Sequence, residues 1–259
     1  MTVFRLAHLS DIHFGDQNRD ALAATSEWLA EHAVDLVVVS GDLTRYAEVA
    51  EFEAAAAWLD TLPQPRLVTP GNHDAPYLAP VERILTPFRR FERLIGPAAS
   101  QTWRDASTAV RGVNTARGAQ PRLNWSKGWI TAKQADEAVA WFQPDDALRI
   151  VVVHHPLIEM LGGPMSARVW GGGAAAERFA KGHVDLVLSG HIHAPFVWPY
   201  PAGDHKTYAV GAGTLSIRER GVAAGFNMIE VDAGQIQVTA LSWSGSKLAP
   251  SQTWAVDKR

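Results

Sequence analysis

The sequences DLVVVSGD at residues 35–42 and DLVLSGHIH at residues 185–193 have the same order of residue types. In each, a short run of Leu and Val is followed at once by serine, glycine and an acidic or imidazole side chain. Three more segments combine a short apolar run with a polar cluster that contains His, Asp or Asn: FRLAHLSDIH at 4–13, RLVTPGNHD at 66–74 and RIVVVHH at 149–155. Short, nearly continuous aliphatic runs are typical of strands that are buried on both faces. We therefore predict five buried strands, each ending in a polar cluster.

The segments between these strands have helical spacing. Residues 131–142 open with a capping box in which Thr131 is followed three residues later by Gln134. Helices are also predicted over residues 20–33, 48–62 and 78–95. Strands that alternate with helices predict a largely parallel sheet covered by helices.

The sequence changes character after residue 193. Short β-like runs at 196–199, 206–210, 226–231 and 235–243 are separated by Gly, Pro and Asp. We interpret them as strands of a second sheet, antiparallel at its edge. The run Gly171-Gly172-Gly173 is expected in a surface loop, and residues 1–259 are expected to form one domain.

Composition excludes several classes of chemistry. The chain has no cysteine, so it has no disulfide, no thiolate nucleophile and no cysteine-bound zinc. Its 24 basic and 27 acidic residues give no electrostatic case for nucleic-acid binding. No signal-peptide pattern and no membrane-spanning apolar run is seen, so a cytoplasmic location is expected.

The polar clusters carry the chemistry, because the carboxyl ends of strands in an open α/β sheet are where functional groups collect. The clusters deliver imidazoles, carboxylates and one amide: Asp11, His13, Asp42, Asn72, His73, Asp74, His154, His155, His191 and His193. This set holds too many imidazoles for Ca²⁺ or Mg²⁺ and suits Mn, Fe, Zn or Co.

In order along the chain, Asp11-x-His13, Gly41-Asp42, Gly71-Asn72-His73-Asp74, His154 and Gly190-His191-x-His193 resemble the five-block signature of the calcineurin-like metallophosphoesterases. The resemblance covers about residues 4–243. It implies an α/β fold: a four-layer α-β-β-α sandwich of two mixed β-sheets flanked by helices. It also implies an enzyme that hydrolyses phosphoesters with a hydroxide bound to two metal ions.

The resemblance further implies a division of the ligands. One metal would be held by Asp11, His13, Asp42 and His193, and the other by Asp42, Asn72, His154 and His191. The shared carboxylate of Asp42 would bridge the two ions and offset their repulsion.

Other residues near these blocks receive roles from the same resemblance. His73 would stabilise the transition state and protonate the leaving oxygen, while Asp74 would hydrogen-bond His73 and raise its pKa. The pattern His-x-Pro selects His154 as the ligand and leaves His155 near the site, where it is a candidate for substrate binding. Asn114 and Arg117 resemble a family position near the substrate and are candidates for substrate binding, with a structural role as the alternative. Arg218-Glu219-Arg220 could contact a phosphate, although a solvated turn is favoured.

The substrate is less well defined than the reaction. The chain is most similar to the class III cyclic nucleotide phosphodiesterase branch. The expected substrate is therefore a small-molecule phosphodiester, either a 3′,5′-cyclic nucleotide or a glycerophosphodiester. Specificity segments are expected at 75–97 and 157–179. A lipid-linked or nucleotide pyrophosphatase is the main alternative, with an apolar lid from 78–95 or 157–165. A nuclease and a non-catalytic scaffold are less favoured functions. The sequence does not specify the oligomeric state, and a homodimer is one alternative.

Overall fold

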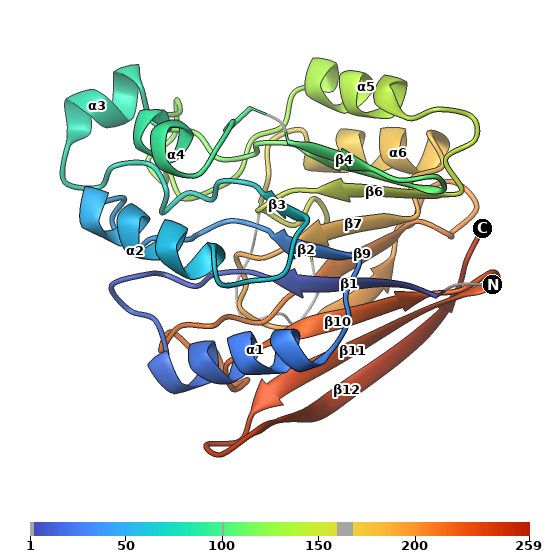
Figure 1. Cartoon of the computed structure of the whole chain (residues 1–259). Coiled ribbons are helices and arrows are strands. Elements are labelled where there is room, and N and C mark those ends of the chain that lie inside the picture. The colour runs from blue at the N-terminus through green and yellow to red at the C-terminus, as the bar shows by residue number, and fades with distance from the viewer. Residues whose placement is uncertain (1–2, 100, 160–167) are drawn as a thin grey trace.

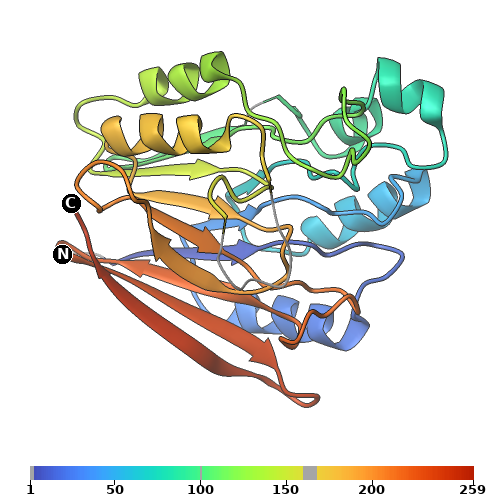
Figure 2. The ribbon, with the colours of Figure 1, turned by 180° about the vertical axis from the view of Figure 1, so that it is seen from behind.

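The computed structural model describes residues 3–99, 101–159 and 168–259, which form two six-stranded sheets packed face to face (Figures 1 and 2). The first sheet has the order β12-β11-β10-β1-β2-β3. Strands β1, β2 and β3 are parallel, and β10 pairs antiparallel with β1. The strands are β1 (Phe4–Leu9), β2 (Leu36–Val39), β3 (Arg66–Val68), β10 (Gly225–Val231), β11 (Gln235–Trp243) and β12 (Leu248–Asp257).

The second sheet has the order β4-β5-β6-β7-β9-β8. Its central strands β5, β6, β7 and β9 are parallel, and β4 and β8 pair antiparallel at the two edges. The strands are β4 (Thr102–Arg104), β5 (Thr108–Gly112), β6 (Leu148–Val152), β7 (Leu186–Ser189), β8 (Phe196–Pro199) and β9 (Tyr208–Gly211).

The aliphatic runs are continuous because both faces of each central strand are buried. In β2, Leu36 and Val38 point into the layer between the sheets, while Val37 and Val39 pack under the helices of the first sheet. In β6, Val152 likewise faces the layer between the sheets, and its neighbours face the helices. Successive side chains of a strand point to opposite faces, so a strand between two apolar layers needs apolar residues throughout.

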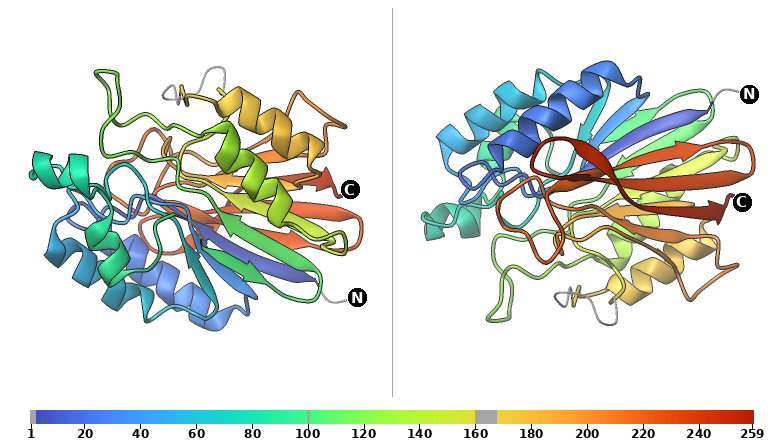
Figure 3. Two further views of the ribbon diagram at one scale, coloured as in Figure 1. Left: turned by 90° about the horizontal axis from the view of Figure 1, so that it is seen from above. Right: turned by 90° about the horizontal axis from the view of Figure 1, so that it is seen from below.

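Helices complete the outer two layers (Figure 3). The first sheet is covered by α1 (Arg19–Glu31), α2 (Val49–Leu59) and α4 (Arg89–Leu94), and the second by α5 (Ala132–Trp141) and α6 (Gly172–Lys181). The predicted capping box of α5 is present, with the Thr131 side chain accepting from the Gln134 amide. The four-layer sandwich expected from the resemblance is therefore confirmed. None of the described helices is long and apolar enough to cross a bilayer.

The assignment of the strands to sheets differs from the residue-based prediction. The strands after residue 193 do not form a second sheet of their own: β8 and β9 extend the second sheet, whereas β10 to β12 extend the first. The five motif strands are also divided, three in the first sheet and two in the second. Strand pairing is a long-range choice that no local pattern specifies.

Two local predictions are also wrong. Residues 78–95 form two short helices, α3 (Pro80–Leu85) and α4, because Pro87 has no amide to donate and disfavours helical backbone at Thr86 before it. The glycine run does not lie wholly in a loop, since Gly172 begins α6. A Cβ at Gly172 would lie 2.5 Å from the Leu157 carbonyl oxygen, so close packing requires the glycine there.

Candidate metal centre

Side chains from both sheets meet at the carboxyl ends of the parallel strands, on the side of the molecule away from the two termini (Figure 1). Four groups of His and Asp ligand atoms lie within 4.8 Å of one another: Asp11, His13 and His193; His13, Asp42 and His73; Asp11, Asp42 and His154; and His154, His155 and His191. The groups share members, so they form one continuous cluster. The cluster combines the loops that follow β1, β2, β3, β6 and β7.

One half of the cluster is centred on Asp11. Its Oδ1 lies 3.1 Å from His193 Nε2 and 3.8 Å from His13 Nε2. The same two imidazole nitrogens are 3.3 Å apart. All three side chains are buried, so three ligand atoms converge on one small volume that water scarcely reaches.

Asp42 joins this half to the other. Its Oδ2 lies 3.8 Å from His13 Nε2 and 3.3 Å from His154 Nε2. The His191 ring follows, with its centroid 5.2 Å from that of His154. One carboxylate oxygen thus stands between an imidazole of each half, which is the placement that a shared ligand requires.

Backbone carbonyls orient the imidazoles. His154 Nδ1 lies 2.8 Å from Ser40 O, His193 Nδ1 2.7 Å from Arg218 O, and His13 Nδ1 3.2 Å from Thr44 O. A carbonyl oxygen only accepts, so each Nδ1 carries a proton and each Nε2 is the nitrogen turned toward the cluster. No sequence signal identifies these partners, because every residue has a carbonyl.

The local electrostatics favour a bound cation. Burial lowers the pKa of His13 to about 3, so its ring is a neutral ligand. Burial would also lower the pKa of His154, but Asp42 outweighs it and raises that pKa to about 9. Burial would raise the pKa of Asp11, whereas His193 lowers it to about 2. The carboxylates therefore stay ionised and hold positive charge at the cluster.

Buried polar atoms without hydrogen-bond partners indicate that the cluster is suited to metal ions. Asp11 Oδ1, His154 Nε2 and His191 Nε2 are buried and have no hydrogen-bond partner in the described part of the chain. Orphaned polar atoms of this kind are rare and costly in a folded protein. Metal coordination at these atoms would satisfy all three, with the mixed N and O donors that borderline metals prefer.

The backbone at these positions is strained. Asp11, His13, Asp42, His191 and His193 all have positive φ, between 49° and 68°. Left-handed backbone is unfavourable for residues with a Cβ and is found where function over-determines the conformation. Sharp turns directly after the strands thus aim these side chains inward.

Glycines make room for the ligands. A Cβ at Gly41, where φ is 95°, would lie 2.6 Å from His154 Nδ1. A Cβ at Gly71 would overlap the Asp42 carboxylate, and one at Gly190 would overlap Ser10 and Asp11. The glycines of the three sequence blocks are therefore explained by close approach of the loops.

His73 lies beside the cluster, half-buried, at the wall of a cavity. Its Nδ1 lies 2.7 Å from Arg45 O, and its backbone amide donates to Asp42 Oδ1 at 2.8 Å. Its Nε2 is 3.4 Å from Arg218 Nη1. The side chain is thus fixed by the loop after β2, and Nε2 lies beside the Arg218 guanidinium.

The predicted pairing of Asp74 with His73 is wrong. The Asp74 carboxylate accepts from the amides of Leu43, Thr44 and Gly71 and from the Thr44 hydroxyl. Burial and the charge of Asp42 raise the pKa of Asp74 to about 7, against the effect of these four donors. Asp74 ties the loop after β3 to the loop after β2, and Arg45 O takes the orienting role assigned to Asp74.

The structure places the three candidate substrate residues away from an open surface. His155 is buried: Nε2 lies 2.9 Å from Ser126 O and 3.1 Å from Asn72 Oδ1, and Nδ1 lies 2.9 Å from Thr115 Oγ1. Arg117 donates to Gln134 Oε1 and to two backbone carbonyls, including that of Asn114. Asn114 and Arg117 line a different pocket from His73. These partners give His155 a role in positioning Asn72 and give Asn114 and Arg117 roles in the scaffold.

Arg218 lies in an exposed segment, as the favoured interpretation had it, but its side chain is only 35% exposed and contacts residues of the site. Its side chain pairs with Asp16 at 3.2 Å and approaches His73, and its carbonyl accepts from His193. Strands β8 and β9 separate Arg218 from His193 in the sequence, and no motif marks its position, so only the tertiary structure brings it here.

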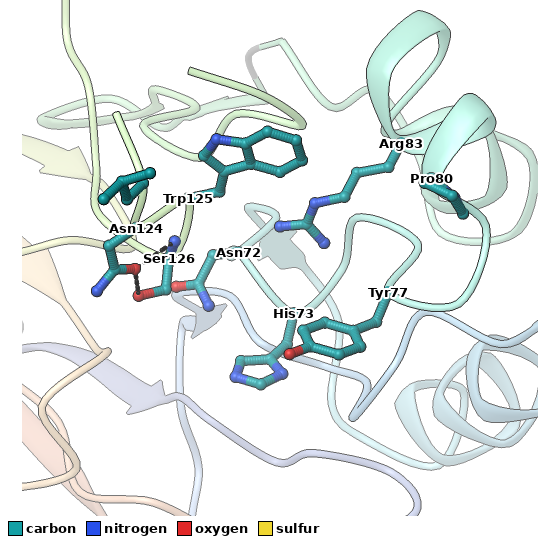
Figure 4. Close-up of a pocket in the computed structure, with 9 residues that line it drawn as sticks. Asn72, His73, Tyr77, Pro80, Arg83, Asn124, Trp125 and Ser126 are labelled. Atoms are coloured by element: carbon teal, nitrogen blue, oxygen red, sulfur yellow. Dashed lines mark hydrogen bonds between the residues drawn. The ribbon is translucent and has the colours of Figure 1, made fainter. Parts of the chain in front are cut away.

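A cavity of about 640 Å³ adjoins the cluster at Asn72 and His73 (Figure 4). The segment before and within α3 supplies Tyr77, Pro80 and Arg83. The loop between β5 and α5 supplies residues 123–126, among them Trp125. Segment 75–97 therefore borders the cavity as expected, whereas residues 160–167 of the second expected specificity segment and of the 157–165 lid lie outside the described residues.

Two mixed sheets between helical layers, with His and Asp side chains gathered at the strand ends, define a metal-dependent phosphoesterase. The chain belongs to the calcineurin-like phosphoesterase family, whose model matches residues 4–195. It is similar to the glycerophosphodiester phosphodiesterase GpdQ of Enterobacter lignolyticus, with 27% identity over 73% of this chain and 70% of the relative.

Two further likenesses extend over nearly the whole chain. A probable cyclic nucleotide phosphodiesterase of Synechococcus sp. is 26% identical over 96% of this chain and 89% of the relative. A dimetal phosphatase from Danio rerio has a similar fold, with a TM-score of 0.70, 10% identity and coverage of 99% of both chains.

Proposed function

We propose that this protein is a phosphodiesterase with a two-metal centre, acting on small phosphodiesters such as 3′,5′-cyclic nucleotides or glycerophosphodiesters. The observation that carries the proposal is the position of Asp42 Oδ2, 3.8 Å from His13 Nε2 and 3.3 Å from His154 Nε2. Asp11, His13, Asp42 and His193 would hold one ion, and Asp42, Asn72, His154 and His191 the other. When bound, two such ions act as Lewis acids on the phosphoryl oxygens and lower the pKa of a coordinated water.

The residues beside the cluster have separate tasks. His73 lines the cavity while Arg45 O fixes its Nδ1, so its imidazolium form would be placed to donate a hydrogen bond or a proton from Nε2 to a leaving oxygen. The Arg218 guanidinium next to it adds positive charge where phosphate oxygens would lie. His155 donates from Nε2 toward the Asn72 side-chain oxygen and so keeps that oxygen in place.

Two observations support a diester rather than a monoester. The relatives with the greatest sequence similarity reported above are named as phosphodiesterases. The cavity of about 640 Å³ beside His73 has room for a second ester substituent, which a monoester lacks.

The test is a substrate panel on protein reconstituted separately with Mn, Fe, Zn or Co. It should contain 3′,5′-cyclic nucleotides, glycerophosphodiesters, lipid diphosphates and the matching monoesters. We expect diester turnover that is abolished by chelation and restored by metal. A clear preference for monoesters, or full activity after exhaustive chelation, would contradict the proposal.

A lipid-diphosphate pyrophosphatase is the second candidate, and one observation favours it. Leu78, Val81, Ile84 and Leu85 are more than half exposed on and before α3, next to the cavity-lining Tyr77 and Pro80. An exposed apolar patch at the mouth of a cavity suits an acyl or isoprenoid chain. Turnover of a lipid diphosphate that requires detergent would select this candidate over the first.

A further inference from the structure

The cavity beside His73 contains one buried cation, Arg83. This residue lies in α3, is 8% exposed and extends its guanidinium into the cavity toward the side formed by Asn72 and His73 (Figure 4). Its presence in a lining of otherwise uncharged and aromatic side chains at the proposed leaving-group side needs an explanation.

The guanidinium is held rigidly by the backbone. Nε donates to Gly118 O at 2.8 Å, and Nη1 donates to Ala75 O at 2.8 Å and to Pro76 O at 3.4 Å. These bonds connect α3 with the chain on both sides of the cavity. They account for Nε and Nη1, and they leave Nη2 without a protein partner in the described part of the chain.

Arg83 also lacks a counter-ion. Across residues 3–99, 101–159 and 168–259, no carboxylate lies within 4.0 Å of its nitrogens. The neighbouring Arg90, by contrast, pairs with Glu82 at 2.6 Å. Burying a cation without an anionic partner is unfavourable, so such residues are retained where a ligand supplies the negative charge.

We propose that Arg83 selects the leaving group of the substrate, favouring phosphodiesters whose leaving alcohol bears an anionic group such as a carboxylate or a second phosphate. The planar guanidinium donates through Nη2 to that group, while Tyr77 and Trp125 supply apolar walls. Leaving groups that carry a quaternary ammonium are disfavoured by the same charge. The inference rests on the proposed phosphodiesterase function, because it assumes that the leaving group enters this cavity.

The test uses three methyl aryl phosphodiesters that differ only at the para position of the leaving phenol: carboxylate, its neutral isostere carboxamide, and trimethylammonium. Each probe is compared between the wild-type protein and a variant, so differences in intrinsic reactivity cancel. Arg83→Met should lower kcat/KM for the carboxylate probe roughly 10- to 100-fold more than for the carboxamide probe. It should raise the relative rate of the trimethylammonium probe.

The matched control is Arg89→Met, which removes an exposed cation from the adjacent helix α4, where the side chain is 73% exposed. This control should leave the ratios among the three probes unchanged. An equal loss for all three probes in Arg83→Met would overturn the inference and assign Arg83 a purely structural role.

A binding measurement covers the case in which Arg83→Met fails to fold. By calorimetry on wild-type protein, 4-hydroxybenzoate should bind more tightly than 4-hydroxybenzamide, and Arg83→Lys should reduce that difference. Equal binding of the two phenols, or an unchanged difference in Arg83→Lys, would overturn the inference. Failure of the wild-type protein to hydrolyse any phosphodiester would instead refute the proposed function, and the binding result would still stand separately.

Discussion

His73 illustrates how a single residue is prepared for chemistry by its surroundings. The Arg45 carbonyl fixes one ring nitrogen, the other lies beside Arg218, and the residue lines the cavity. A ring nitrogen of His73 lies within 4.8 Å of ligand atoms of His13 and Asp42, but the hydrogen-bond partners of the ring are Arg45 O and Arg218. The residue therefore fits a donor to the leaving oxygen better than a metal ligand.

Replacing His73 with Ala should leave metal content unchanged and reduce kcat roughly 10²- to 10⁴-fold, the range for loss of a general acid. The loss should be smaller for a leaving group of low pKa, such as 4-nitrophenol, because such a group departs without protonation. Activity assays with paired poor and good leaving groups, together with metal analysis, check this expectation. An equal loss for both leaving groups would argue against proton donation.

Asp42 has a different proposed role, that of a shared ligand, because both halves of the cluster meet at its carboxylate. Asp42→Ala should remove both metal ions and abolish activity, since the shared ligand is lost. Metal analysis by mass spectrometry gives the readout, with Asp136→Ala as a control that removes a 63% exposed carboxylate of α5, outside the cluster. Two retained ions in Asp42→Ala would contradict a bridging role.

At the scale of elements, the loops after the strands matter more than the strands. Asp74 joins the loop after β3 to the loop after β2 through three hydrogen bonds, from Leu43 and Thr44, and Gly71 lets the loops approach. Both loops present residues of the cluster. The loops are therefore expected to lose their arrangement together if this connection is cut.

Asp74→Ala should destabilise the protein by about 3 kcal/mol or more, because buried donors lose their acceptor. It should also weaken metal binding, since Asp42 and Asn72 lie in the two loops that it joins. Urea unfolding and metal titration measure the two effects. A stable variant that binds metal normally but loses catalysis would restore the catalytic role that the sequence suggested for Asp74.

The sequence predicted which residues form the cluster better than it predicted the tertiary contacts of the residues around it. The strand ends, the glycines and the side chains of the cluster follow local patterns, since a buried strand and a sharp turn are visible in a few residues. The role of Asp74, the position of Arg218 and the scaffold contacts of Arg117 depend on tertiary neighbours. The helix break at Pro87 was readable from the sequence, but the apolar stripe of residues 78–95 obscured it.

At the scale of the whole molecule, the cluster connects the two sheets. Asp11, His13, Asp42 and Asn72 follow strands of the first sheet, whereas His154, His191 and His193 follow strands of the second. The resemblance implied two mixed sheets, but neither it nor the residue-based prediction assigned the five motif strands to them. A bound metal would therefore cross-link the two halves of the sandwich.

Metal removal should lower the stability of the whole fold. A ligand at about 100 times its Kd stabilises the native state by about 2.7 kcal/mol, so chelation should lower Tm by roughly 5 °C or more. Calorimetry before and after chelation, and after adding metal back, measures the shift. An unchanged Tm in protein shown to have lost its metal would mean that the ions do not link the sheets.

The central claim is that side chains from five loops hold two metal ions around Asp42. Anomalous diffraction from crystals of the metal-reconstituted protein tests it most directly. The account predicts two peaks on opposite sides of the Asp42 carboxylate, one beside Asp11, His13 and His193 and the other beside Asn72, His154 and His191. A single peak, or none within coordination distance of Asp42, would contradict it.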